Sequence, residues 1–194
     1  MSFRFLLAAF LIAPLPGLAA ADSSAEAQKS LRAAIEQALA IADRAPDRPT
    51  MVERLRPVLE KNISFAAMTR RAVGPGWRQF NADQQKKATT LFTTLIVRSY
   101  SNKFTIGEHP AISYLAPVAP APGRVDVPTT TVYQGSRYSV IYRMEKEEGW
   151  RVTDVVIEGV SMVANYRSQL DDKFKKGGAD AVLSSLTESA SRPQ

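Results

Sequence analysis

The apolar residues of this chain change their spacing in the middle of the sequence, and this change limits the possible folds more than any other feature. Up to about Phe104 they recur every three or four residues, which is the period of a helix. From Ala111 to Ile157 they alternate, which is the period of a strand, and after Gly159 the helical period returns. Helices, then a block of strands, then helices predict an α+β domain.

The helical segments have recognisable ends. A first helix is expected over 24–44, and a second around 52–59. The longest helix should begin at Asn81, because Asn81 and Gln84 have the spacing of a capping box, and its broad apolar face favours burial against a sheet. The last long helix should be capped by Ser161 and end at the glycine pair 177–178.

The alternating block predicts a curved, meandering antiparallel sheet. Its strands are expected around 112–115, 125–133, 138–144 and 150–157, with turns between them. Pro128 lies within the second of these strands and argues for an edge strand or a bulge. The predicted fold is therefore a helical N-terminal half and an antiparallel sheet, with C-terminal helices that enclose an apolar cavity.

The first 21 residues have the order of a cleavable signal peptide. One early charge, Arg4, precedes a short apolar run, and Ala19 and Ala21 occupy the small-residue positions that a signal peptidase recognises. The predicted cut lies before Asp22, which leaves 22–194 as one exported domain. A membrane anchor is the alternative, but the apolar run is shorter than the roughly 20 residues of a spanning helix and is followed by prolines.

The composition excludes several kinds of site. The chain has no cysteine, which excludes disulfides, a lipoprotein anchor, thiol catalysis and thiolate metal sites. His109 is the single histidine and reads as a surface loop residue, so neither a metal site nor a cofactor is predicted. No motif of a hydrolase or metalloprotease accompanies it, and no catalytic residue is assigned.

Basic residues outnumber acidic ones by 25 to 19, and they are concentrated in one part of the chain. Eight of them fall where the only acids are Glu60 and Asp83: Arg54, Arg56, Lys61, Arg70, Arg71, Arg78, Lys86 and Lys87. A solvated helical face is the simpler interpretation. In an exported protein the alternative partner is an anionic lipid surface or an acidic protein face, and not nucleic acid.

The stretch from Gly149 to Gln169 resembles the signature of the MlaC family, also called the toluene-tolerance proteins. Further positions agree with that family across most of the chain after residue 21: Phe65, Met68, Val73, Gly74, Trp77, Gln84, Gln85, Phe92, Tyr100, Tyr142, Arg143, Gly178, Ala179, Asp180, Leu183 and Leu186. The resemblance implies a fold similar to the cystatin and nuclear-transport-factor cone.

The same resemblance implies a periplasmic carrier that shuttles phospholipid and so maintains the lipid asymmetry of the outer membrane. Its implied partners are an inner-membrane complex of an MCE protein with an ABC transporter, and an outer-membrane lipoprotein complex. A branch of the family accompanies hopanoid biosynthesis, so a hopanoid stays open as the cargo. Two other classes also stay open: an acid–base enzyme on a cone-shaped fold, and an adaptor that carries nothing.

Eleven apolar residues are the candidates for a lipid-binding wall between the long helix and the sheet. They are Phe92, Leu95, Ile96 and Tyr100 on the helix, Val140, Tyr142, Val152 and Val155 on the strands, and Val160, Val163 and Tyr166 after Gly159. Two acyl chains buried among such residues would gain about 0.8 kcal/mol for each methylene. Ordinary core packing is the alternative for each of them, because both uses need the same residue types.

The polar residues of the signature have two interpretations. Ser161, Asn165 and Arg167 either meet a headgroup or serve the structure, with Ser161 as a helix cap and Arg167 paired with an acid, and the structural interpretation is favoured. Asp154 and Glu158 share a strand face, yet pairing with an arginine is expected for them rather than acid–base catalysis.

Overall fold

The computed structural model describes residues 16–101 and 106–192, with the side chains of these residues apart from 16–21 and Tyr100. Most of the expected signal peptide, and Phe104, lie outside the described residues. Within them the architecture is α+β, with five α-helices, one 3-10 helix and a six-stranded antiparallel sheet, which confirms the predicted class. None of the described helices combines the length and apolar character needed to cross a membrane.

The first two helices follow the predicted pattern. α1 (Pro16–Arg44) begins earlier than the apolar spacing indicates. α2 (Arg48–Asn62) is capped by Asp47, whose carboxylate accepts a hydrogen bond of 2.8 Å from the Thr50 amide, and this bond lowers the pKa of Asp47. Pro57 lies inside α2 without ending it.

Two short helical segments follow, and then a longer helix that has the predicted cap. α3 (Phe65–Val73) runs into the 3-10 helix η1 (Gly74–Gln79), and α4 (Ala82–Ser101) follows. The Gln84 amide donates to Asn81 Oδ1 at 2.9 Å, and the Asn81 amide donates to Gln84 Oε1 at 3.0 Å. The capping box predicted from sequence is therefore present.

The last helix, α5 (Met162–Ser191), consists of two segments that meet at a kink. Ser161 caps it as predicted, with its hydroxyl accepting a hydrogen bond of 3.0 Å from the Ala164 amide. At the kink Gly177 and Gly178 leave helical geometry, and Gly178 adopts φ 62°. Both α1 and α5 are longer than α4, so the prediction that α4 is the longest helix is wrong.

The sheet has the strand order β1-β3-β4-β5-β6, and β2 pairs with the same strand, β3, as β1 does. Its strands are β1 (Ala111–Tyr114), β2 (Val118–Ala121), β3 (Arg124–Tyr133), β4 (Ser136–Lys146), β5 (Trp150–Ile157) and β6 (Val160–Ser161). β3 and β4 are joined by a two-residue turn in which Gln134 and Gly135 both have positive φ, the geometry of a tight hairpin.

Pro128 does not mark an edge strand, because β3 is paired on both sides. On one side β3 pairs with β1 through Thr129 and with β2 through Asp126, so Pro128 lies where one partner strand gives way to the other. Its carbonyl accepts a hydrogen bond of 2.9 Å from the Leu115 amide. Proline has no N–H to donate, and this position lies at the gap between β1 and β2. No acceptor on either strand therefore loses a hydrogen bond.

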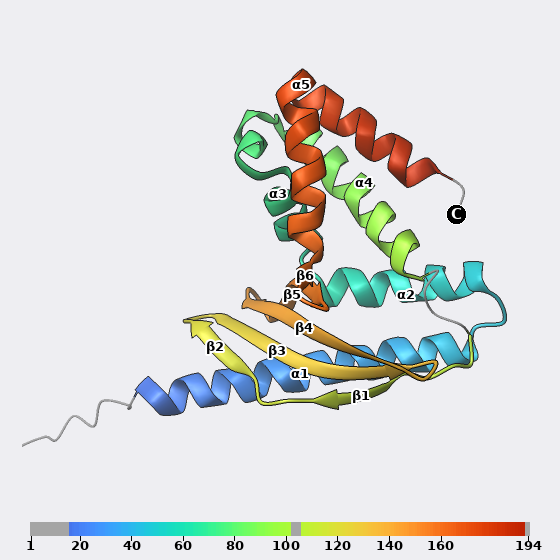
Figure 1. Ribbon diagram of the computed structural model, residues 1–194, viewed down its shortest axis with the longest axis vertical. Coiled ribbons are helices and arrows are strands. Elements are labelled where there is room, and N and C mark those ends of the chain that lie inside the picture. Colours follow the sequence, from blue (N-terminus) through green and yellow to red (C-terminus); the bar gives the residue numbers. More distant parts are fainter. Residues whose placement is uncertain (1–15, 102–105, 193–194) are drawn as a thin grey trace, which may run out of the picture.

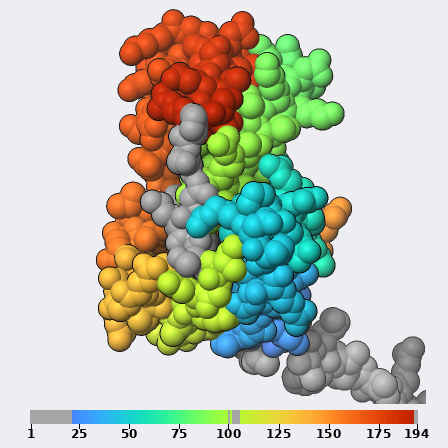
Figure 2. Space-filling view, turned by 90° about the vertical axis from the view of Figure 1, so that its right-hand side faces the viewer, coloured from blue at the N-terminus to red at the C-terminus, as the bar shows by residue number. Residues whose placement is uncertain are grey.

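The molecule has a helical part and a sheet part (Figure 1). α1 lies along one face of the sheet and contacts β3 and β5, while α3, α4 and α5 pack together beyond the β5 end. In the side view α2 (cyan) lies between the sheet with α1 below and the C-terminal helices above (Figure 2). The broad apolar face of α4 packs mainly against α5 and α3, and not against the sheet as its width had suggested.

Candidate functional site

The helical part holds an apolar cluster in which four of the eleven candidate residues are buried, and two more, Val155 and Tyr166, pack against it. Phe92, Leu95 and Ile96 of α4 are buried in it, and Val163 and Tyr166 of α5 join them. The rings of Phe92 and Tyr166 meet edge to face with centroids 5.2 Å apart. Burial raises the pKa of the Tyr166 hydroxyl. These residues form what we call the helical cluster.

The sheet part holds a second cluster on the face that α1 covers. The strand register places Val127, Tyr142 and Val155 side by side across three strands, on the same face as Val152. A bulge at Thr153 brings Val152 and Val155, three residues apart, to that common face. We call this group, completed by residues of α1, the sheet cluster.

Tyr142 lies deep in the sheet cluster although its surface is only partly covered. Desolvation by its surroundings raises the pKa of its hydroxyl to about 12, and the neighbouring Tyr114 adds to the increase. This desolvation agrees with the position of Tyr142 against the sheet cluster.

The two clusters meet along a seam. Ile63 and Val155 are partly buried and pack against both clusters. Ile63 is held there because the chain between α2 and α3 runs beside β5, where the Ser64 amide donates a hydrogen bond of 2.9 Å to the Val152 carbonyl. Through Ile63 and Val155 the structure brings the helical cluster and the sheet cluster into contact.

Three candidates do not take part in the seam as described. Val140 is buried in β4 but belongs to neither cluster, and Val160 is 63% exposed on β6. Tyr100 lies on α4, and its side chain is not among those described. Sequence reasoning also missed residues that the structure places in the sheet cluster: Ala27, Leu31, Ile63, Val125, Val127, Met144 and Trp150. The strict alternation of Val125 and Val127 was the available signal for two of them.

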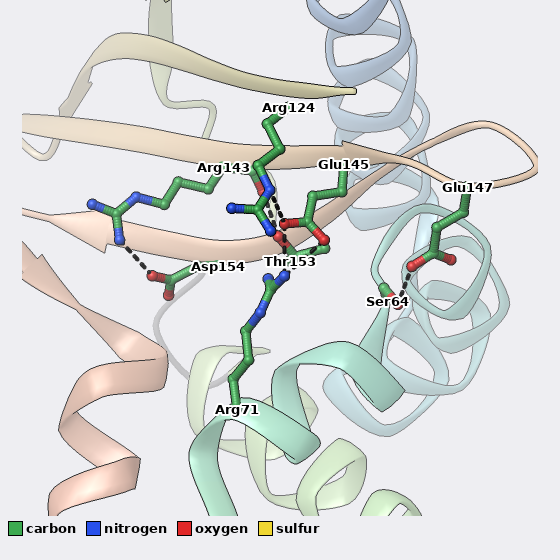
Figure 3. A network of polar contacts seen from close by, with 8 residues as sticks. All are labelled: Ser64, Arg71, Arg124, Arg143, Glu145, Glu147, Thr153 and Asp154. Atoms are coloured by element: carbon green, nitrogen blue, oxygen red, sulfur yellow. Dashed lines mark hydrogen bonds and ion pairs between the residues drawn. The ribbon is translucent and has the colours of Figure 1, made fainter. Parts of the chain in front are cut away.

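The other face of the sheet carries charge. The register aligns Asp126, Arg143 and Asp154 in one row across β3, β4 and β5, and Arg124 with Glu145 in the next row. Opposite charges in neighbouring strands stabilise such a face. Figure 3 shows how the arginines of this face and of α3 converge on the carboxylates.

Asp154 is the best-satisfied of these acids. Its carboxylate, 8% exposed, accepts hydrogen bonds from the Ser161 hydroxyl at 2.6 Å and the Val163 amide at 3.1 Å. It also pairs with Arg143 at 3.1 Å, a contact drawn in Figure 3. The predicted arginine partner is therefore confirmed. Glu158 accepts instead from the Ser139 amide. The two carboxylates have separate structural contacts, and this arrangement does not favour a paired acid and base.

The other candidate for chemistry, His109, is exposed and pairs with Asp43 at 2.8 Å. Across residues 16–101 and 106–192 no three metal-ligating side chains gather to hold an ion. The described residues thus form an apolar contact region between two clusters and a charged face on the sheet, where Asp154 has structural contacts.

Two comparisons with known proteins place the chain in a family. The family model described as MlaC protein matches residues 27–188. The solved structure of the phospholipid-binding protein from Ralstonia solanacearum, in complex with a phospholipid, is similar to this fold with a TM-score of 0.77. It is 26% identical in sequence, and the similarity covers 85% of this chain and 97% of that one. Among curated proteins nothing matches the chain. Because the family model spans most of its length, this chain belongs to the MlaC protein family.

Proposed function

We propose that this protein binds phospholipid by its acyl chains in the seam between the helical cluster and the sheet cluster, and carries it through water. The observation that carries the proposal is that Ile63 and Val155 stay partly exposed between two buried clusters, with Tyr142 partly exposed in the sheet cluster and Tyr166 in the helical cluster. A seam of this kind can admit an acyl chain by a modest separation of its sides. Each methylene that enters gains about 0.8 kcal/mol.

The similarity to a phospholipid-binding protein in complex with its ligand supports the same ligand class here. Membership of the MlaC family supports carriage rather than catalysis, and the engagement of Asp154 and Glu158 in separate contacts points the same way.

The finer proposal is a periplasmic shuttle. The sequence of the first 21 residues supports export and cleavage before Asp22. The shuttle would receive or deliver phospholipid at an inner-membrane complex of an MCE protein with an ABC transporter and at an outer-membrane lipoprotein complex, and so maintain outer-membrane asymmetry. Sequencing the N-terminus of the protein isolated from the periplasm should give Asp22 as the first residue. Recovery of the uncleaved chain with the cytoplasmic fraction would contradict export.

Cargo is tested by extraction. The protein is purified from its own host, extracted with organic solvent, and the extract is analysed by mass spectrometry. Phospholipid in stoichiometric amount is expected. An extract free of lipid would overturn carriage, and a hopanoid would overturn the phospholipid assignment while leaving carriage intact.

The seam is tested by a substitution that fills it without burying charge. Val155→Phe is expected to lower the amount of co-purified phospholipid several-fold, because a larger side chain occupies the space between the clusters. Val118→Phe is the matched control, since Val118 is 59% exposed on β2. Circular dichroism establishes that both variants are folded. Full lipid content in a folded Val155→Phe protein would place the acyl chains elsewhere.

A further inference from the structure

A pocket of about 590 Å³ lies where the charged face of the sheet meets α3 and the start of α5. Four arginines from four elements line it: Arg71 of α3, Arg124 of β3, Arg143 of β4 and Arg167 of α5. The acids in its lining are Asp126, Glu145 and Asp154. We call it the arginine pocket, and its charged network is seen in Figure 3, apart from Asp126 and Arg167.

The acids of the pocket are unevenly distributed among its arginines. Arg143 stands between Asp126 and Asp154 in the cross-strand row, so its charge is matched twice. Arg71 and Arg124 share one carboxylate, Glu145, at 2.6 Å and 3.1 Å. The half of the pocket near α3 therefore has more guanidinium than carboxylate charge, even before Arg167 is counted.

Arg167 adds a cation to that half. Its guanidinium lies against Gly74, at the end of the helix that carries Arg71, where a Cβ would come within 3.1 Å of Arg167 Nε. It makes no ion pair or hydrogen bond with any described residue. The pairing with an acid that the sequence favoured for Arg167 is thus not found among these residues.

The pocket also offers unused hydrogen-bond donors. Arg124 pairs with Glu145 through Nε, and its side chain is 60% exposed, which leaves the outer edge of its guanidinium directed to solvent. By contrast, the backbone amides at the start of α5 are occupied, because Asp154 takes the Val163 amide and Ser161 takes the Ala164 amide. Side-chain guanidinium groups, and not the helix end, are what an anion would find here.

We propose that the arginine pocket binds a phosphate-type oxyanion between Arg71, Arg124 and Arg167. Guanidinium groups that approach from different elements suit a tetrahedral anion, whose oxygens point in several directions, better than a flat carboxylate. Two sources supply this chemistry: the phosphate of a lipid headgroup, or a free phosphate or phosphate ester. Met144 of the sheet cluster and Val163 of the helical cluster also line the pocket, which places it beside the seam.

Binding of the anion is tested on the purified protein with inorganic phosphate and sn-glycerol 3-phosphate as probes. Isothermal titration calorimetry should detect both at low ionic strength, with succinate at least tenfold weaker. Arg167→Gln should weaken phosphate at least tenfold, whereas Arg137→Gln, an exposed arginine at the far end of β4, should leave it unchanged. Absence of phosphate binding, or equal affinity in the wild type and Arg167→Gln, would overturn the proposal.

A second arm identifies the source, and only this arm rests on the proposed lipid-carrying function. Dihexanoyl phosphatidic acid and dihexanoylglycerol differ by the phosphate. If the headgroup is the anion, Arg167→Gln weakens the phosphatidic acid and not the diacylglycerol, and inorganic phosphate competes with the former. If the anion is a free phosphate, inorganic phosphate binds lipid-loaded and lipid-free protein with equal affinity. Both lipids then bind the Arg167→Gln variant with the same affinity as the wild type. Failure of both lipids to bind, with phosphate binding intact, would count against carriage and not against the arginine pocket.

Discussion

Tyr142 combines partial surface access with a strongly desolvated hydroxyl, and this combination gives the protein an alkaline dependence of stability. Its pKa is about 12 in the folded protein and close to 10 in an unfolded chain. Above pH 10 the unfolded state has released a proton that the folded state keeps, so the free energy of unfolding falls as pH rises toward 12. The loss from Tyr142 should reach about 2–3 kcal/mol.

Urea unfolding between pH 9 and pH 12 measures this loss. Tyr142→Phe should flatten the dependence, because the phenol that ionises in the unfolded state is removed. Tyr138→Phe is the control, since Tyr138 is 39% exposed and should leave the slope unchanged. Identical slopes in wild type and Tyr142→Phe would show that the hydroxyl is solvated.

Asp154 connects the sheet to α5 through one buried carboxylate. Asp154→Ala leaves the Ser161 hydroxyl, the Val163 amide and Arg143 without their acceptor, and two of these donors are at the start of α5. We expect the free energy of unfolding to drop by about 2–3 kcal/mol. Urea titration at neutral pH checks this against Asp172→Ala, an exposed acid on α5 that should cost less than about 0.5 kcal/mol. Similar losses for both variants would contradict the connecting role.

The kink of α5 depends on one backbone conformation. Gly178 has φ 62° and ψ −150°, a region open in practice only to glycine, while a Cβ at this position would meet no atom within 4 Å. Gly178→Ala should therefore destabilise the protein by about 1–3 kcal/mol through backbone strain alone. Gly149→Ala is the matched control, because Gly149 also has open space but no left-handed φ. Thermal unfolding of the two variants makes the comparison, and an unchanged midpoint for Gly178→Ala would mean that the kink is adaptable.

At the scale of elements, the sequence predicts most of what is determined locally. The capping box at Asn81, the cap at Ser161 and the break at Gly177 depend on contacts within a few residues, so spacing alone identifies them. The partners of α4 are not local. Its apolar face fits a sheet and a pair of helices equally well, and only the three-dimensional packing selects α3 and α5.

The same distinction explains the candidate site. Phe92, Leu95 and Ile96 can be assigned to one face from helical period, whereas the alignment of Val155 with Tyr142 depends on the bulge at Thr153. A bulge leaves little trace in sequence, since it shifts the register by one residue. The arginine pocket needs four separate elements to meet, and no local pattern indicates such a meeting.

Among the described residues the helical cluster and the sheet cluster touch through Ile63 and Val155, and a third apolar cluster lies between α1 and α2. In the structure the helical cluster is tightly packed, with Leu95 and Ile96 7% and 5% exposed, and Ile63 and Val155 pack against both clusters. Under the proposed function, a lipid that enters the seam would have to separate the helical part from the sheet part. The exchange between closed and open forms then precedes or limits binding.

This arrangement predicts saturating kinetics for lipid entry. Lipid-free protein mixed with monomeric dihexanoyl phosphatidylcholine should show a change in tryptophan fluorescence whose rate reaches a plateau as lipid concentration rises, because opening of the seam becomes limiting. Val155→Ala should raise the plateau, since a smaller residue weakens the contact between the clusters, whereas Val118→Ala on exposed β2 should not. A rate that stays proportional to lipid concentration throughout would indicate a cavity that is already open, and the two parts of the molecule would then behave as one rigid unit.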